Sequence, residues 1–219
     1  MYCMLYNFSE HHSIAGKYVA ELRDVEIQTD RLRFRTNMER IGELMAYEIS
    51  KKLAYKKVEV QTPLGTAMAY IPEKPIVLAT IMRAGLPMQQ GMLRIFDDAG
   101  CAFVSAYRMH HKDGTFEINM EYMSCPTLDG KTLILSDPML ASGASMKMVL
   151  EALLKFGKPH SIHLATAIAS TYGVDQIQRF FPDAYLWMAA LDEELTAKSY
   201  IVPGLGDAGD LAFGEKLQD

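Results

Sequence analysis

The segment Thr132-Leu133-Ile134-Leu135-Ser136-Asp137-Pro138-Met139-Leu140-Ala141-Ser142-Gly143-Ala144-Ser145-Met146 decides the fold of this chain. The apolar run Leu133 to Leu135 is too short for a helix and does not alternate with polar residues, so it predicts a buried strand of a parallel sheet. Residues 147–156 then carry apolar side chains at helical spacing. The segment therefore predicts a strand, a short loop of small residues and a helix, which is the repeating unit of an α/β fold.

The loop between this strand and helix has the features of a phosphate-binding site. Ser142-Gly143-Ala144-Ser145 places small side chains where the N–H groups of a helix start are unpaired and partly positive. Asp137 lies at the carboxyl end of the strand, where open α/β sheets bind ligands and a carboxylate can accept hydrogen bonds from sugar hydroxyls. A loop of this kind alone is more often a tight connection. It also lacks the motifs of nucleoside triphosphate and dinucleotide sites.

Composition limits the class of protein. The chain has 219 residues, of which 49% are apolar and 22% charged, as expected of one globular domain. No apolar run reaches membrane-spanning length and no signal sequence is evident, so we expect a cytoplasmic protein. The net charge of −5 opposes nucleic-acid binding. The three cysteines form no metal-like or redox pair, and we expect reduced thiols.

The remaining apolar runs predict strands and helices in alternation after an irregular start. Strands are expected at 56–60 (followed by a turn at 62–65), 75–81, 101–108, 159–170 and 185–190, and helices at 13–23, 30–55, 88–96 and 174–181. This order predicts a parallel, doubly wound sheet flanked by helices. We interpret residues 1–219 as a single domain with N-terminal helices (1–55), a core (56–192) and a tail (193–219).

A second ligand loop follows the predicted strand 75–81. There Met82-Arg83-Ala84-Gly85-Leu86 again places small residues between a strand and a helix. The guanidinium of Arg83 offers a fork of donors that suits diphosphate oxygens. A lone loop arginine is usually only solvated, but its position in the sheet favours contact with a ligand.

Residues 109–124 predict a flexible β-arm that could close over a site. Asp113-Gly114 is a hairpin signal, the flanking residues alternate between apolar and polar, and Arg108 stands at the start of the arm. His110 and His111 could be proposed as metal ligands. Because neighbouring residues of a strand point to opposite faces, we expect no protein-bound transition metal there.

The tail contains Tyr200-Ile201-Val202-Pro203-Gly204-Leu205-Gly206-Asp207-Ala208-Gly209-Asp210. Glycines and proline give it little helix or strand character, and such pairs usually indicate only turns. A long irregular backbone also exposes N–H and C=O groups. We therefore interpret the tail as a recognition surface for a planar heterocycle.

Together these segments resemble the uracil phosphoribosyltransferases. Asp-Pro-Met-Leu-Ala-Ser-Gly-x-Ser resembles their motif for phosphoribosyl diphosphate (PRPP), Arg-Ala-Gly-Leu resembles their pyrophosphate loop, and the tail resembles their base-binding segment. The resemblance covers nearly the whole chain in the same order. It implies a type I phosphoribosyltransferase fold with a flexible β-arm and a C-terminal hood over the base. The implied reaction converts uracil and PRPP to UMP and diphosphate.

The resemblance also implies roles for individual residues. PRPP would contact Arg83, Arg108, Asp137, Pro138, Met139, Leu140, Ala141, Ser142, Gly143, Ala144, Ser145 and Asp207. Uracil would contact Ile201, Gly206, Asp207 and Ala208, and the catalytic groups would be Arg83, Arg108, Asp137 and Asp207. Mg²⁺ would be held through substrate and water rather than by a protein cage. The family further implies a homodimer or larger homo-oligomer and activation by GTP.

Three positions depart from the family pattern, and they leave alternatives open. Most members have Thr and Gly where this chain has Ser142 and Ala144, and a basic residue where it has Leu211. Alanine suits the loop unless that position needs a positive φ. The alternatives are a phosphoribosyltransferase for a purine or orotate, a pyrimidine-responsive RNA-binding regulator of the same fold, and an inactive paralogue.

Overall fold

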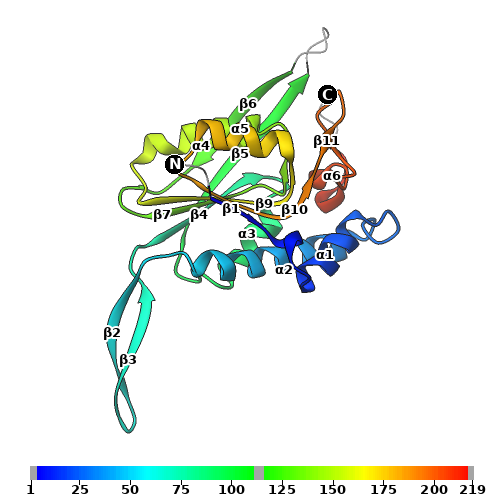
Figure 1. The fold of residues 1–219 in the computed structure, drawn as a ribbon. Helices are drawn as coiled ribbons and strands as arrows, with labels where there is room; N and C mark the ends of the chain where they lie inside the picture. Colours follow the sequence, from blue (N-terminus) through cyan, green and yellow to red (C-terminus); the bar gives the residue numbers. More distant parts are fainter. Residues whose placement is uncertain (1–3, 111–115, 217–219) are drawn as a thin grey trace.

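A mostly parallel sheet of eight strands forms the centre of the molecule (Figure 1). The computed structural model describes the backbone of residues 4–110 and 116–216, and their side chains except at 106–110 and 116–120. The strands follow the order β1 (Met4–Asn7), β10 (Tyr185–Asp192), β9 (Ser161–Ser170), β7 (Thr132–Ser136), β4 (Ile76–Met82), β5 (Gly100–His110) and β6 (Phe116–Ser124), with β8 (Met139–Leu140) beside β9. Among these pairings only β5 with β6 is antiparallel.

The strand order reverses between β4 and β7. From β4 the chain adds β5 and β6 on one side, then returns to place β7 and β9 on the other. Thr80 of β4 lies in register with Ser136 of β7. Carboxyl ends at such a switch point are the usual ligand site of open α/β sheets. The two predicted ligand loops follow these two strands.

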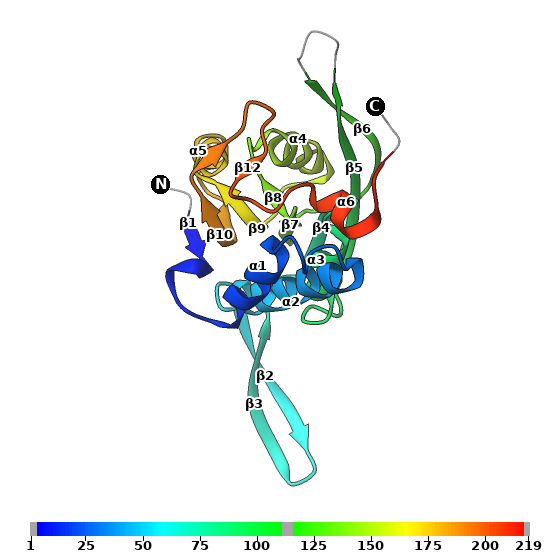
Figure 2. The same ribbon diagram turned by 90° about the vertical axis from the view of Figure 1, so that its right-hand side faces the viewer.

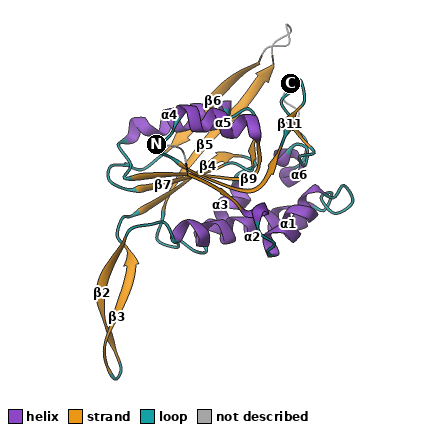
Figure 3. Ribbon diagram, in the orientation of Figure 1, coloured by secondary structure: helices purple, strands orange, loops and turns teal. Residues whose placement is uncertain are grey.

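Helices cover both faces of the sheet (Figures 1 and 3). One face carries α1 (Ile14–Arg23), α2 (Arg31–Ser50) and α3 (Leu86–Leu93), and the other carries α4 (Ala144–Leu153) and α5 (Thr171–Phe180). Helix α2 buries apolar side chains at steps of three and four residues, namely Phe34, Met38, Ile41, Met45 and Ile49. Within the described residues, no helix is long and apolar enough to cross a bilayer.

Two hydrophobic cores lie on opposite faces of the sheet. Phe34 and Trp187 belong to the core under α1, α2 and α3, while Leu133 and Val149 belong to the core under α4 and α5. His163 is a buried polar residue of β9, and its Nδ1 accepts a hydrogen bond from Trp187 Nε1 at 3.2 Å. Burial lowers the pKa of His163 to about 4, so the imidazole is neutral at neutral pH.

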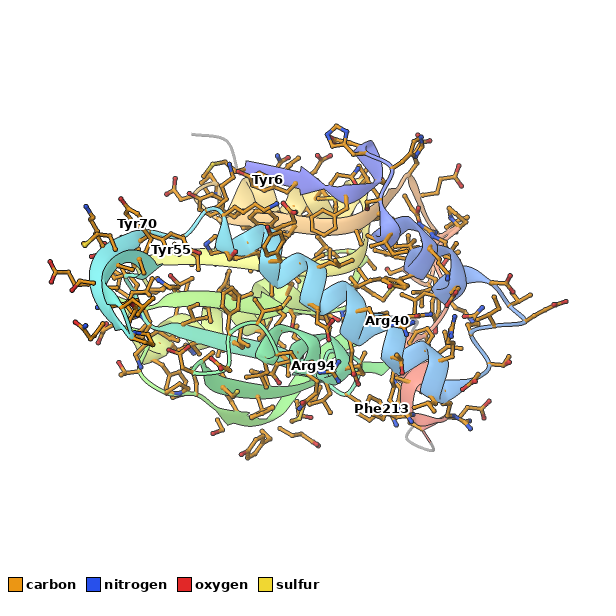
Figure 4. All side chains as sticks on the ribbon, turned by 90° about the horizontal axis from the view of Figure 1, so that it is seen from below. Tyr6, Arg40, Tyr55, Tyr70, Arg94 and Phe213 are labelled. Atoms are coloured by element: carbon orange, nitrogen blue, oxygen red, sulfur yellow. The ribbon has the colours of Figure 1, made fainter. Side chains whose placement is uncertain are left out.

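A two-stranded ribbon, β2 (Tyr55–Thr62) and β3 (Gly65–Pro72), stands away from the sheet (Figures 1 and 2). Seen from below, Tyr55 and Tyr70 lie on this ribbon, far from Phe213 at the other end of α2 (Figure 4). The ribbon exposes large apolar side chains: Leu64 is fully exposed and Tyr70 is 67% exposed. The expected turn at 62–65 is confirmed, but the strand that follows it was not predicted.

Most predicted elements are confirmed, and three predictions were wrong. The irregular start contains the edge strand β1 and a turn of 3-10 helix, η1 (Phe8–Glu10), because four residues pair with β10 without a long apolar run. The helix expected at 30–55 ends at Ser50. The tail, expected to be irregular, contains β11 (Glu194–Leu195), β12 (Ile201–Val202) and α6 (Ala208–Phe213). A 3-10 turn, η2 (Leu154–Phe156), extends α4. The hairpin signal Asp113-Gly114 lies outside the described residues.

Candidate active site

The loop after β7 is fixed by main-chain bonds to the neighbouring strand β9. The carbonyl of Pro138 accepts hydrogen bonds from the N–H groups of Ala167 and Ile168, at 3.1 and 2.9 Å. The carbonyl of Ala141 accepts a hydrogen bond from Ser170 Oγ at 2.6 Å, and β8 pairs with β9 between these points. The loop is therefore part of the sheet edge rather than a free connection.

Helix α4 begins at the end of this loop, at Ala144. Gly143 precedes it with φ of 78°, a left-handed conformation that glycine adopts without strain. Ala144 needs no positive φ, because Ser199 is the only non-glycine residue with one in the described chain. The alanine at this position is thus compatible with the loop geometry.

A cavity of about 540 Å³ adjoins the loop and the start of α4. It is lined by Ser142, Gly143, Ala144 and Lys147, and across from them by residues of α5 and of the segment 195–199. The hydroxyl oxygen of Ser142 is buried and has no hydrogen-bond partner in the described part of the chain. Because a buried hydroxyl without a partner is unfavourable, a ligand oxygen at this place would be stabilising. The ammonium of Lys147 lies 3.3 Å from the centre of the Phe180 ring.

The loop after β4 lies between the loop after β7 and the tail. A Cβ at Gly85 would clash with the Thr80 side chain and the Ile81 carbonyl, and it would lie 3.1 Å from the carbonyl of Ser136. On the other side, the Arg83 guanidinium donates to Asp210 Oδ1 at 2.9 Å and to the carbonyl of Gly214 at 3.3 Å. The peptide bond between Met82 and Arg83 is cis.

The tail folds over the carboxyl edge of the sheet and ends in helix α6. Asp207 caps this helix: its Oδ1 accepts from the N–H groups of Gly209 and Asp210, at 2.8 and 3.0 Å. The other carboxylate oxygen lies 3.8 Å from Lys216 Nζ. Gly206 has φ of 99°, a conformation that favours glycine. Sequence reasoning missed α6 because the helix has six residues and contains glycine.

The sequence profile of the uracil phosphoribosyltransferase family matches residues 9–215. The chain belongs to the uracil phosphoribosyltransferase family. A uracil phosphoribosyltransferase of Porphyromonas gingivalis is 54% identical over 207 residues, which are 94% of this chain and 96% of the relative. One of Pyrococcus furiosus is 37% identical over 217 residues, covering 98% of this chain and 91% of the relative.

A solved structure of a protein from Aquifex aeolicus has the same overall fold, with a TM-score of 0.87 and 28% identity. It is matched over 98% of this chain and 100% of its own length. The family, the α/β fold and the PRPP-dependent transfer to uracil that the motifs predicted are confirmed by these relatives. Between a purine or orotate substrate and uracil, these relatives support uracil.

The structure brings most of the residues matched to uracil phosphoribosyltransferase motifs to one edge of the sheet. The loop 137–145, the loop at Arg83 and the tail from Ile201 to Asp210 meet there through the contacts described above. Arg108 lies in β5 opposite Ile118, and its side chain is outside the described set. Gly206 and Asp207 line a second cavity, of about 460 Å³, which shares no lining residue with the cavity at Ser142.

Leu211 is the position where uracil phosphoribosyltransferases usually carry a basic residue. Here its side chain is half-buried and packs against the core beneath α1 and α2, close to Gly206. Asp207 has the ammonium of Lys216 at 3.8 Å. Arg35 of α2 also holds the end of α6, donating to the carbonyl of Ala212 at 2.7 Å with its guanidinium 6.0 Å from the Phe213 ring centre.

The carboxylates at this edge suit a hard cation held mainly by a substrate. Asp137 and Asp207 are acids of the matched motifs that the resemblance assigns to PRPP, and carboxylates with phosphate oxygens are the ligands that Mg²⁺ prefers. Within the described residues, no cluster of three or more His, Cys, Asp or Glu side chains could form a cage for a metal. The chemistry of Asp137 and Asp207 fits a Mg²⁺ ion that phosphate oxygens also bind.

Sequence reasoning missed the residues that hold the tail in place. No role was assigned to Arg23 or Asp192 from the sequence. A carboxylate directly after the apolar run 185–191 was the available signal, because the carboxyl ends of strands in open α/β sheets are the usual ligand site.

Proposed function

We propose that the chain makes UMP by placing uracil and PRPP against the carboxyl edge of β4 and β7. The observation that supports this placement best is the loop 137–145. Its backbone is fixed by β9, it opens α4, and it holds a buried hydroxyl with no partner in the described chain, at Ser142. Such a loop suits a phosphate, which accepts bonds from N–H and hydroxyl donors.

In this proposal the ribose 5′-phosphate binds to the backbone from Ala141 to Ser145, with the hydroxyls of Ser142 and Ser145. Asp137 accepts hydrogen bonds from the ribose hydroxyls. Binding energy from the phosphate, which does not react, then orients the anomeric carbon toward the base.

The leaving diphosphate requires fixed positive charge. Arg83 and Arg108 supply it in our proposal, and Mg²⁺, when bound, neutralises further charge on the diphosphate. The guanidinium of Arg83 already has Asp210 and the Gly214 carbonyl as partners, so Asp210 orients it and shares it with the ligand. Asp207 completes the PRPP site.

Main-chain groups of Ile201, Gly206 and Ala208 recognise uracil in this proposal. A carbonyl facing N3–H and an N–H facing O4 accept uracil and reject cytosine, whose donor and acceptor are reversed. Sites that would leave polar groups unpaired can discriminate by about 10⁴ or more.

We further propose a homodimer or larger homo-oligomer in the cytoplasm, formed in part through the β2–β3 ribbon. Isolated two-stranded ribbons are marginal in water, and this one exposes Leu64, Met68 and Tyr70. A second copy of the chain would cover these side chains. Sedimentation should therefore give at least a dimer, and Leu64→Asp with Tyr70→Asp should shift it toward monomer.

The decisive experiment is UMP formation from PRPP with uracil, cytosine, hypoxanthine or orotate, with and without Mg²⁺ and GTP. We expect UMP from uracil, strong dependence on Mg²⁺, little product from the other bases, and a higher rate with GTP. Absence of UMP would contradict the proposal and support an inactive paralogue. Retention of RNA at moderate salt would instead support the alternative of a pyrimidine-responsive RNA-binding regulator.

A further inference from the structure

A partly buried ion pair holds the turn of the tail between the residues matched to uracil binding. Arg23, the last residue of α1, donates from Nη1 and Nη2 to the two carboxylate oxygens of Asp192, each at 2.7 Å. Asp192 is the last residue of β10 and is 6% exposed, while the Arg23 side chain is 22% exposed. The pair thus joins α1 to the carboxyl end of the sheet.

The same two side chains bind both polar groups of one peptide residue, Gly204. Its N–H donates to Asp192 Oδ2 at 2.9 Å, and its carbonyl accepts from Arg23 Nη1 at 3.0 Å. Gly204 has φ of 56°, and a Cβ there would clash with the carbonyl of Ile201. The backbone at this turn is therefore fixed from both sides by charge-assisted bonds, which are shorter and stronger than neutral ones.

A second, separate set of contacts holds the other end of the tail. Helix α6 is capped by Asp207, and Asp210 pairs with Arg83. The stretch from Ile201 to Gly206 is thus held at Gly204 by the first anchor and is followed directly by the second anchor at Asp207 and Asp210. Loosening the first anchor displaces this stretch, while the groups assigned to PRPP keep their own contacts.

We propose that Arg23 and Asp192 are positioning residues for the base: they set the main-chain groups of residues 201–206 against uracil without touching it. This inference rests on the proposed function of the tail. An exposed ion pair would contribute little. This pair is partly buried and bidentate, and it is bonded to the backbone that it orients, so its loss changes geometry as well as stability.

Asp192→Asn tests the inference, because it keeps the size of the side chain and removes its charge. We expect the KM for uracil to rise by about 10-fold to 100-fold, as for a misplaced binding group, and the preference for uracil over cytosine to fall. The KM for PRPP should change by less than about threefold, because its contacts lie elsewhere. An unchanged KM for uracil, or equal rises for both substrates, would overturn the inference.

The Arg33–Glu21 pair provides a matched control. It also joins an arginine to a carboxylate in two bonds, both at 2.8 Å, and it links α1 to α2 without contacting the tail. Glu21→Gln should lower the unfolding temperature and leave both KM values unchanged. An equal rise in the uracil KM for this control would show a general effect of loosening α1, and would also overturn the inference.

Arg23→Lys keeps the positive charge but loses the fork of donors. It should show a weaker version of the Asp192→Asn effect, and it decides the question if Asp192→Asn does not fold. The wild-type protein distinguishes a failure of the proposed function from a failure of the positioning role. If it forms no UMP from uracil, the proposed function fails; if it does and both variants keep its uracil KM, only the positioning role fails.

Discussion

The loop 137–145 and the tail both lie at the carboxyl edge of the sheet, but they are held in different ways. The loop 137–145 is held against β9 by hydrogen bonds from main-chain groups and from the side chain of Ser170. The tail is held by charged side chains from α1, α2 and the loop after β4: Arg23, Arg35 and Arg83 each bind a group in the segment 192–214. The loop is thus an extension of the sheet, whereas the tail is a separate layer attached to it.

This difference predicts which substitutions disturb which substrate. Changes in the backbone of the loop, or in β9 beneath it, should affect PRPP and overall stability. Changes in the arginines and their carboxylate partners should affect the tail. The following experiments test that division, in order of expected size.

Lowering the pH should have the largest effect of these experiments, a decrease in the free energy of unfolding that comes from His163 in β9. His163 in β9 is neutral in the fold with a pKa near 4, whereas in the unfolded chain its pKa is about 6.5. Stability is complete above pH 6.5 and falls as the pH drops toward 4, because only the unfolded chain then binds the proton. The loss is about 3 kcal/mol. Urea unfolding at pH 7, 5.5 and 4.5 measures it, and His163→Gln should lack this part of the loss.

Gly143→Ala should weaken PRPP binding next most strongly. An alanine at φ of 78° is strained by about 1 kcal/mol, and the displaced loop should raise the KM for PRPP by about 10-fold or more. Gly130→Ala is the control, because Gly130 also has positive φ (67°) but lies in another turn. It should lose similar stability with no change in KM. A larger rise in the KM for uracil than in the KM for PRPP would contradict the assignment of this loop to PRPP.

Asp210→Asn should lower kcat/KM by about 10-fold, because Arg83 loses the carboxylate that orients it. Arg83 belongs to both regions, so we expect both substrates to be affected. Glu43→Gln, which removes a partner of the exposed Arg94, is the matched control and should leave steady-state kinetics unchanged. Wild-type kinetics for Asp210→Asn would show that Arg83 needs no partner from the tail.

Ala144→Gly and Leu211→Lys should have the smallest effects, within about threefold in kcat/KM. Ala144 is helical and needs no glycine, and Leu211 packs against the core. Steady-state kinetics with both substrates decide this. An increase of orders of magnitude in either variant would instead identify the chain as a degenerate, inactive relative.

The loop was predictable from sequence and the attachment of the tail was not. A buried run, small residues and an apolar helix are local signals, and the loop that they form is local as well. Arg23 and Asp192 are 169 positions apart, and only the fold reveals that they meet. The strands β1 and β3 were missed for a related reason: each owes its form to a partner strand rather than to an apolar pattern of its own. Helix α6 was missed because it has only six residues and contains Gly209.

The main-chain attachment of the loop 137–145 affects how many amino-acid substitutions the loop can tolerate. In the proposed binding mode, a phosphate held through peptide groups does not contact most of the side chains around it, so threonine in place of Ser142 or glycine in place of Ala144 should leave binding intact. In that binding mode, the backbone conformation of the loop determines phosphate binding, and several of its side chains can be exchanged.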